Sequence, residues 1–347
     1  MSETGLKTTV TNAADSFMKL FEGQIEESRI ELSDYARQCA YSTVLSVNRL
    51  LLDNGLSWKE MDNSNVIDII TTVAGLELNP NATPREVYFQ IRKKKVKQVD
   101  SNSGKSTEVW KNMVEVGIEG DGNDAILSRF GRGVKTVHRF WIVRENDSFT
   151  YPKRNGLEII PPTWEPKGAG KCIRVVYPVT FNDGQTEYYI CERDEVINNL
   201  MAHISNNMMN ETFGVCPNRY NATEVQKAEI AMKKREYLKK AAEKGLDVLD
   251  DPEFDPWISS AWRSEYSREQ MLLRKMRNNI VKKIPKDFSI QQGALAFSES
   301  EGDAYSSPKS NVIDVDFEEV GITQNADEKK ALERLNGEVV SNDSDAG

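Results

Sequence analysis

Two glycine-containing segments have residue types suited to nucleotide binding. The run GKST at residues 104–107 matches the end of the phosphate-loop pattern G-x-x-x-x-G-K-[ST], but Val99 stands where the first glycine belongs. The run GDGNDA at residues 120–125 mimics a dinucleotide-binding turn, although its two aspartates would repel a pyrophosphate. We therefore expect both segments to be loops or turns, and we expect no nucleotide cofactor.

Residues for acid–base or nucleophilic catalysis are equally sparse. The two histidines, His138 and His203, do not stand beside a serine or cysteine in a nucleophile motif. Carboxylates are plentiful enough for a metal-dependent nuclease, but they form no compact motif that separates them from surface acids. The sequence predicts a binding protein without an active site, cofactor or metal, and a metal nuclease is the alternative that degradation of DNA would reveal.

Basic and aromatic residues are the remaining candidates, and the function they suit is nucleic-acid binding. Basic residues concentrate in RKKKVK at residues 92–97, over residues 129–154 and over residues 262–288. Aromatic residues lie among them, so that cations for phosphates are interleaved with flat rings for unstacked bases. The plain alternative is that the basic runs are solvated faces and the rings belong to the core.

Charge is distributed unevenly along the chain. The 347 residues carry a formal net charge of -9. Residues 299–347 hold 13 acidic and four basic residues, so this segment alone accounts for the net charge. Its polar composition predicts a disordered acidic tail with one short apolar motif at residues 312–317, behind a body that is neutral overall but carries basic clusters.

The cysteines and the hydropathy pattern indicate the compartment. Cys39, Cys172, Cys191 and Cys216 form no C-x-x-C pair, which argues against a zinc site and a disulfide framework. The start of the sequence lacks an apolar stretch behind a positive end, and no segment approaches about 18 uninterrupted apolar residues. We expect a cytoplasmic protein with buried, reduced thiols and no membrane contact.

Helical periodicity dominates the first third of the chain. Apolar residues at three- and four-residue spacings predict helices over residues 14–21 and 30–52, and Ser33 with Asp34 is suited to start the second of these. Another helix is expected over residues 65–76, ending near Gly75. Residues 1–28 are expected to form an N-terminal arm or helix.

The pattern changes to that of strands from about residue 85. The α+β fold expected here combines an antiparallel or mixed sheet of about four to six strands with packed helices. A hairpin turn is expected at residues 181–184, where Gly184 tolerates positive φ. A short helix over residues 124–130 should be closed by Gly131 and Gly133. The expected strand segments are residues 86–99, 110–120, 134–147, 171–181 and 185–195.

Helical patterns return in the second half of the chain. A helix is expected over residues 192–207, and the charged residues 224–245, with their sparse apolar positions, predict a helical insertion over residues 206–255. A closing helix over residues 266–285 follows, with basic residues on most of its surface. Its predicted buried stripe consists of Leu273, Met276, Ile280 and Ile284.

The order of motifs resembles the RecT family of phage single-strand annealing proteins over residues 29–288, apart from the insertion. GLELNP at residues 75–80, followed by VYF at residues 87–89, is similar to the family's helix end and first strand. GIEG at residues 117–120, the short helix with Arg129 and ENDSF at residues 145–149 are similar to its central motifs.

The closing element of the family is also matched, with two departures. Trp257, Met271, Arg274 and Pro285 resemble its tryptophan, its methionine with basic residues behind it, and its helix-ending proline. Glu119 stands where relatives often have lysine, and Leu273 and Lys275 flank Arg274 where a Lys-Lys-Thr run is common.

The resemblance implies a core at residues 29–298 related to the Red beta proteins and to eukaryotic ring-forming annealing proteins. Such proteins assemble into rings or helical filaments, bind single-stranded DNA and its annealed duplex, and need no ATP. It further implies a phage or prophage origin, a location in the bacterial cytoplasm, a partner 5′ to 3′ exonuclease and contact with a host single-strand-binding protein.

We expect a groove between the sheet and the closing helix to hold one strand by its phosphates. A passive single-strand coat or replication accessory protein would use the same residues. The predicted base-stacking residues are Tyr88, Phe130 and Trp141. The predicted DNA-binding residues are Arg92, Lys93, Lys95, Arg129, Arg132, Lys135, Arg139, Arg274, Lys275 and Lys282.

Three roles are open for the acidic tail. It could compete with DNA for the basic groove, recruit a partner through residues 312–317, or act only as a solvated segment that aids solubility.

Overall fold

The computed structural model describes residues 9–27, 31–99 and 106–288. The helices are α1 (Thr9–Glu27), α2 (Asp34–Asp53), α3 (Asn63–Gly75), α4 (Gly120–Phe130), α5 (Ile197–Asn207), α6 (Glu224–Lys244), α7 (Ser260–Arg263) and α8 (Glu265–Lys283). The strands are β1 (Val87–Val99), β2 (Ser106–Ile118), β3 (Val134–Val137), β4 (Trp141–Arg144), β5 (Ser148–Thr150), β6 (Lys153–Asn155), β7 (Glu158–Ile160), β8 (Thr163–Glu165), β9 (Cys172–Phe181) and β10 (Thr186–Glu192). Every pair formed by these strands is antiparallel, so the expected α+β class is confirmed.

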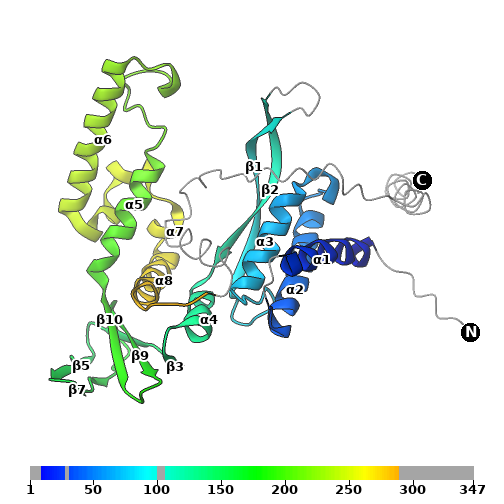
Figure 1. The fold of residues 1–347 in the computed structure, drawn as a ribbon. Helices are drawn as coiled ribbons and strands as arrows, with labels where there is room; N and C mark the ends of the chain where they lie inside the picture. Colours follow the sequence, from blue (N-terminus) through cyan, green and yellow to red (C-terminus); the bar gives the residue numbers. More distant parts are fainter. Residues whose placement is uncertain (1–8, 28–30, 100–105, 289–347) are drawn as a thin grey trace, which may run out of the picture.

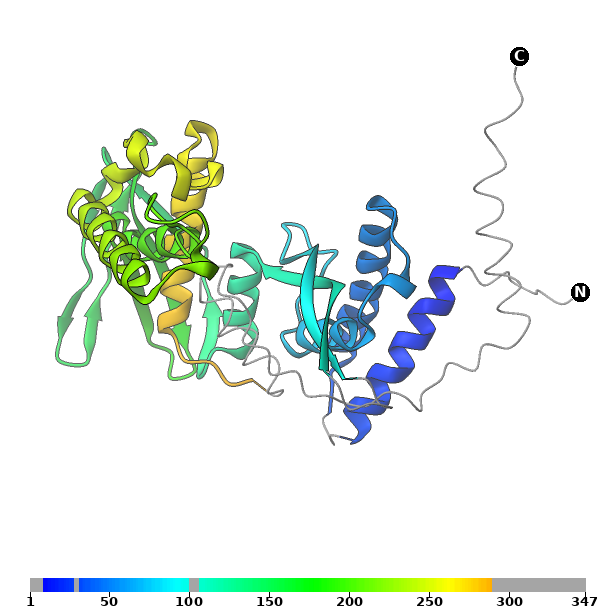
Figure 2. The same cartoon turned by 90° about the horizontal axis from the view of Figure 1, so that it is seen from above.

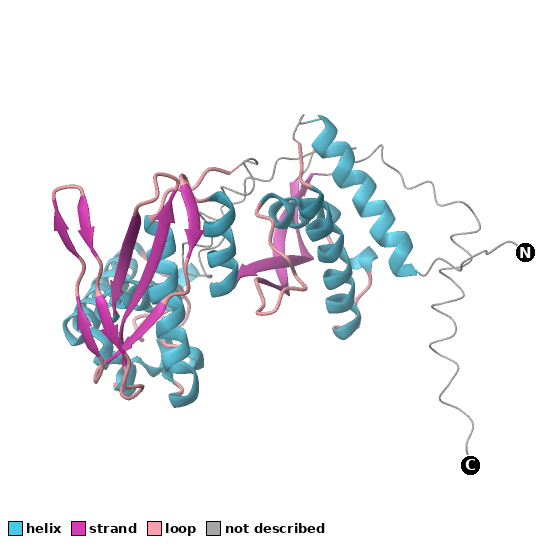
Figure 3. Cartoon of the chain, turned by 90° about the horizontal axis from the view of Figure 1, so that it is seen from below, coloured by secondary structure: helices cyan, strands magenta, loops and turns pink. Residues whose placement is uncertain are grey.

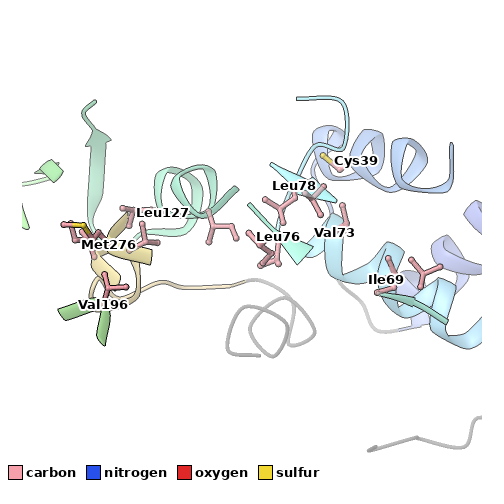
Figure 4. Packing of buried hydrophobic residues seen from close by; sticks show 14 of the residues in the cluster. Cys39, Ile69, Val73, Leu76, Leu78, Leu127, Val196 and Met276 are labelled. Carbon is pink, nitrogen blue, oxygen red and sulfur yellow. The ribbon is translucent and has the colours of Figure 1, made fainter. Parts of the chain in front are cut away.

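The elements form two lobes on either side of α4 (Figure 1). The N-terminal lobe holds α1 to α3 with the β1–β2 hairpin, and the C-terminal lobe holds the other strands with α5 to α8 (Figure 2). Buried side chains continue through α4, because Leu127 lies beside Met276 on one side while Leu76 and Leu78 lie on the other (Figure 4). The two lobes therefore share one hydrophobic core.

Capping residues set the starts of the helices in the N-terminal lobe. The Ser33 side chain accepts a hydrogen bond from the Ala36 amide, so α2 begins at Asp34 rather than at the expected residue 30. The carboxylate of Asp62 accepts from the Asn65 amide at the start of α3. Because α3 is buried along most of its length, it forms the centre of this lobe.

The β1–β2 hairpin stands apart from the other strands. Its register pairs Val87 with Ile118 and runs to Val99 opposite Ser106. Alternation puts Val87, Phe89 and Ile91 on the face that packs against the helices of the N-terminal lobe. The distal end of the hairpin extends beyond α3 (Figure 1).

The expectation of a single sheet is wrong. Strands β10, β9 and β3 form a second sheet in that order, and β4 also pairs with β9. The hairpin turn between β9 and β10 is confirmed, with Gly184 at φ 83°. The segment expected as one strand at residues 134–147 is divided into β3 and β4, because residues 138–140 interrupt the ladder.

A wing at residues 148–165 projects from this four-stranded sheet. It is a single two-stranded ribbon with two successive ladders, β5 with β8 at its base and β6 with β7 at its tip. Asp147 organises the base of the wing, because its carboxylate accepts hydrogen bonds from the amides of Arg144 and Lys167 and from the indole of Trp164.

The closing helix lies against the four-stranded sheet. Helix α8 contacts both β9 and β10, and Leu272, Met276 and Ile280 are fully buried in the interface. The predicted stripe is therefore correct at Met276, Ile280 and Ile284 and wrong at Leu273, which is only partly buried. Leu272, four residues before Met276, completes the stripe at the helical period.

Residues 206–255 contain both solvated and packed parts. Only Ile230 and Ala241 are buried in α6, as its charged sequence indicates. The 3₁₀ helix that follows at Pro252–Trp257 supplies Phe254 to the core, and the ring of Trp257 lies 4.9 Å from that of Tyr237 in α6. Three other 3₁₀ segments flank these helices, at Arg193–Val196, Arg219–Asn221 and Gly245–Asp250.

The four cysteines are buried and unpaired, as expected. Burial raises the pKa of the Cys39 thiol to about 12 and that of Cys172 to about 11. Within the described residues, no helix is both long enough and apolar enough to span a membrane. Residues 104–105 of the GKST run and the whole acidic tail lie outside the described residues, whereas Ser106 and Thr107 of that run begin β2. The turn expected at residues 120–125 is wrong, because this segment forms the start of α4.

Candidate nucleic-acid interface

The β1–β2 hairpin carries the first group of predicted residues, divided between its two faces. Arg92 and Lys94 lie on the face turned away from α3, whereas Lys93 is on the opposite face and is exposed. Lys95 belongs to β1, but its side chain is outside the described part of the chain. No described residue forms an ion pair with Lys93.

A single carboxylate serves two cations on the outer face of the hairpin. Arg92 Nε lies 2.8 Å from Glu115 Oε2, and Lys94 Nζ lies 2.7 Å from Glu115 Oε1. Lys111, opposite Lys94 in the register, reaches Asp62 at 2.9 Å. We call Arg92, Lys94 and Lys111 the hairpin cation face. Glu115 can neutralise only one of its two partners.

Tyr88 lies on the same face of the hairpin, at its base. Its ring covers Gly117, the residue opposite it in the register, so closely that a Cβ at position 117 would lie 2.2 Å from the Tyr88 Cζ. The glycine therefore creates the space for the ring, which stays partly exposed on the face that also carries the cations.

Arg129 is held by partners within the protein, although 25% of its side chain is exposed. Its guanidinium donates to the Glu77 carbonyl at 2.6 Å, to both oxygens of Glu86 at 3.4 Å, and to the Tyr35 hydroxyl at 3.3 Å. These partners come from the N-terminal lobe. Arg129 thus fixes α4 to that lobe.

Arg274 and the lysines of α8 form the second group. Arg274 Nη2 donates to the Ile118 carbonyl at 3.0 Å, and its Nη1 lies 3.1 Å from Glu119. Lys275 lies 6.0 Å from the centre of the Trp262 ring, and Lys282, one heptad later, is partly buried on the same side of the helix. The glutamate that departs from the RecT pattern is therefore the ion partner of Arg274.

Arg277 is a connector that the sequence analysis did not select as a site residue. It donates to Asp121 at 2.9 Å, to Asp124 at 2.6 Å and to the Tyr177 hydroxyl at 3.0 Å, and it lies over the Phe140 ring. Burial raises the pKa of Asp124, while the charge of Arg277 opposes that shift. Helix α8 is thus joined to α4 by paired charges.

Arg132 and Phe130 are occupied at the end of α4. Arg132 forms a bidentate pair with Asp287, with distances from 2.6 to 3.0 Å, although both side chains are exposed. The Phe130 ring packs on Phe288 with centroids 5.3 Å apart. An intramolecular contact therefore already covers one face of this predicted stacking ring.

Lys135 of β3, Arg139 of the segment between β3 and β4, and Trp141 of β4 make up the third group. Lys135 and Arg139 are exposed, and neither has an ion pair with a described residue. Trp141 stacks on Trp164 of the wing with centroids 5.6 Å apart, and it also lies near Tyr188.

The groove hypothesised between the sheet and the closing helix is wrong for the four-stranded sheet. Met276 and Ile280 of α8 pack directly on β9 and β10, so core side chains fill that space. The structure groups the predicted residues at the hairpin, at the α4–α8 junction and on β3 and β4, rather than in one channel.

Five residues that bear on the candidate site were missed. Lys94 and Lys111 were missed because the sequence does not give the pairing register of β1 with β2, so the KKK run does not show which lysine shares a face with Arg92. Selecting Trp164 and Tyr188 as stacking residues would have required the position of the wing and the order of the strands in the sheet. The missed residues are Lys94, Lys111, Trp164, Tyr188 and Arg277.

No protein-family model, curated protein or solved structure matches the chain. Among the described residues, no cluster of three or more histidine, cysteine, aspartate or glutamate side chains is arranged to hold a metal ion.

Proposed function

We propose that this protein binds single-stranded DNA and anneals it to a complementary strand without nucleotide hydrolysis. The observation that carries the proposal is the hairpin cation face, where Arg92, Lys94 and Lys111 line a projecting two-stranded hairpin with Tyr88 at its base. The resemblance to the RecT family supports the same function.

Phosphates would bind by replacing the carboxylate that two cations now share. Arg92 is 38% exposed and Lys94 is 28% exposed, so both heads are accessible to a phosphate without unfolding of the hairpin. Arginine grips phosphate with two parallel hydrogen bonds, whereas lysine acts as a point charge. Lys93 adds a cation on the opposite face.

Contacts to phosphate carry no sequence information, which suits a protein that must anneal any DNA. The strand held on the hairpin would keep its base edges available for pairing. Stacking of each new base-pair step then supplies about 1.4 kcal/mol on average, so annealing needs no ATP.

Assembly with other copies follows from the same proposal. A two-stranded hairpin has two outer edges, and the edge of β2 has one bridge to the rest of the chain, between Met61 and Asn112. Rings or filaments would place successive hairpins along one strand. The proposed partners are a 5′ to 3′ exonuclease that exposes the strand and a host single-strand-binding protein that coats it.

Annealing of two labelled complementary oligonucleotides, without ATP and at two salt concentrations, tests the proposal. Wild type should accelerate annealing, and higher salt should suppress the acceleration. Replacing Lys93 and Lys94 together by glutamate should abolish it, whereas Lys239→Glu on the exposed α6 should not. Binding without acceleration would indicate a passive coat protein, and magnesium-dependent degradation of the strands would indicate a nuclease.

A further inference from the structure

The face of the four-stranded sheet that points away from α8 carries a group of aromatic rings. On β9, Val175, Tyr177 and Val179 belong to the core that α8 covers, so Val176 and Pro178 point the other way. In Figure 3 the strands of this sheet lie in front of the helices that pack on their other face. No described helix covers this outer face.

The rings come from three strands. Trp141 of β4 stacks on Trp164 of β8 at an interplanar angle of 20°, and its centroid is 6.0 Å from that of Tyr188 in β10. Beneath them, Val143 and Val176 are fully buried although they lie outside the main hydrophobic cluster. The three rings, which we call the aromatic face, are thus held in place from below and remain partly exposed.

Two irregularities in the ladder of the same sheet coincide with its exposed cations, Lys135 and Arg139. The register against β9 shifts between Val134 and Thr136, at Lys135. It gains one further residue between Val137, opposite Val179, and Trp141, opposite Val176, in the segment that holds Arg139. Extra residues of this kind re-aim side chains out of the sheet, and both cations are exposed.

We propose that the aromatic face binds the unstacked bases of a nucleic-acid strand, and that Arg139 and Lys135 hold its phosphates. Stacking on tryptophan and tyrosine tolerates every base, because each base has a flat π face. Rings that are fixed in advance lose little entropy on binding. The inference rests on the proposed single-strand binding and adds a second contact surface, which grips bases where the hairpin grips phosphates.

Polar groups around the rings fit this ligand. His138 Nε2 lies 2.8 Å from Thr180 Oγ1, which in turn lies 2.8 Å from Thr186 Oγ1, so a row of hydrogen-bonding groups crosses the same face next to the rings. These groups can bond to base edges or to phosphate oxygens without selecting a sequence.

Titration with an oligothymidylate strand and with an abasic strand of equal length tests the inference. Tyr188→Leu should weaken thymidylate binding by about 5-fold or more, and it should leave abasic binding unchanged. Tyr220→Leu is the matched control, because Tyr220 is 83% exposed in a separate 3₁₀ turn. Quenching of tryptophan fluorescence by thymidylate should fall in Trp141→Phe.

A second variant and a crosslinking experiment distinguish lost binding from loss of the folded structure. Arg139→Glu changes an exposed residue, so the fold should be retained while thymidylate affinity falls. A strand that carries 5-iodouracil should crosslink within residues 134–192. Crosslinks confined to the β1–β2 hairpin would overturn the inference. Unchanged thymidylate affinity in both Tyr188→Leu and Arg139→Glu would also overturn it, and would leave the aromatic face to a peptide or to no ligand.

The two proposals fail in different ways. If the aromatic-face variants bind like wild type while the Lys93 and Lys94 reversal binds weakly, the aromatic face is excluded and the annealing proposal stands. If wild type binds neither strand, both proposals fail.

Discussion

Gly117 is the residue on which the position of Tyr88 depends. Adding a Cβ there would place it 2.2 Å from the ring, so Gly117→Ala must displace Tyr88. We expect this variant to lose no more than about 1 kcal/mol of unfolding free energy, because the outer end of a partly exposed ring can move aside, and to bind single strands more weakly. Urea unfolding measures the first effect.

Gly23→Ala provides the control for that substitution. Gly23 lies inside α1 with open space at its Cβ position, so alanine there should raise stability by about 0.5 to 1 kcal/mol. Equal effects of the two alanines would contradict the contact between Tyr88 and Gly117.

Arg129 should behave as a structural residue rather than a phosphate ligand. Lysine cannot reproduce the forked contacts to Glu77, Glu86 and Tyr35, so Arg129→Lys should lower the unfolding free energy by about 2 to 3 kcal/mol. DNA affinity at a temperature where the variant is folded should stay near that of wild type. A stable variant with lost affinity would show instead that Arg129 contacts DNA.

The side of α8 that faces the core predicts different stability effects for two neighbouring leucines. Leu272 is fully buried, whereas Leu273 is only partly buried against the core. Leu272→Ala should cost about 2 to 5 kcal/mol, and Leu273→Ala clearly less. Thermal unfolding of both variants measures the difference, and reversed costs would indicate that the helix is rotated by one residue.

The base of the wing should be sensitive to acid. The hydrogen bond from the Arg144 amide, together with those from Trp164 and Lys167, lowers the pKa of Asp147 to about 2. The pKa of an aspartate in an unfolded chain is about 3.9. Because the folded pKa is lower, ionised Asp147 stabilises the wing above that pH, and the stabilisation is lost as the pH falls towards about 2. Fluorescence of Trp164 should report the change. Asp147→Asn should remove this pH dependence.

The strands show where sequence reasoning succeeds and where it stops. Segments 86–99, 171–181 and 185–195 were placed close to β1, β9 and β10, because β-branched and aromatic residues alternate in them. The grouping of strands was missed, since local composition says nothing of which strand pairs with which. The extra residue near Arg139 that separates β3 from β4 has no local signal either.

The sequence identifies which candidate site residues are basic, but it does not show which of them are free of intramolecular ion pairs and can bind a phosphate. Arg92, Arg129 and Arg274 are all arginines in basic runs, yet each meets a carboxylate from a segment distant along the chain. Lys93 and Lys135 come from the same runs, and neither forms an ion pair within 4.0 Å with a described residue, although the charge of Lys93 helps to lower the pKa of Glu60. Only the folded chain separates these two groups.

Removal of the acidic tail is the prediction for the whole molecule. Ending the chain at residue 298 removes the segment that holds the entire formal charge of -9. If the tail competes with DNA for the basic surfaces, the truncated protein should bind single strands more tightly, with an effect that shrinks as salt rises. Affinities in fluorescence anisotropy that match those of the full chain would exclude competition.

The pairing of α4 with α8 also sets an order of events during synthesis. Asp121 meets Arg277, which lies 156 positions later in the chain. At about 5 to 20 residues per second, a ribosome needs about 8 to 30 s to make that stretch. The N-terminal lobe can thus form first, while Asp121 and Asp124 at the start of α4 await their partner. Docking of the two lobes through α4 and α8 is therefore among the last steps of folding during synthesis.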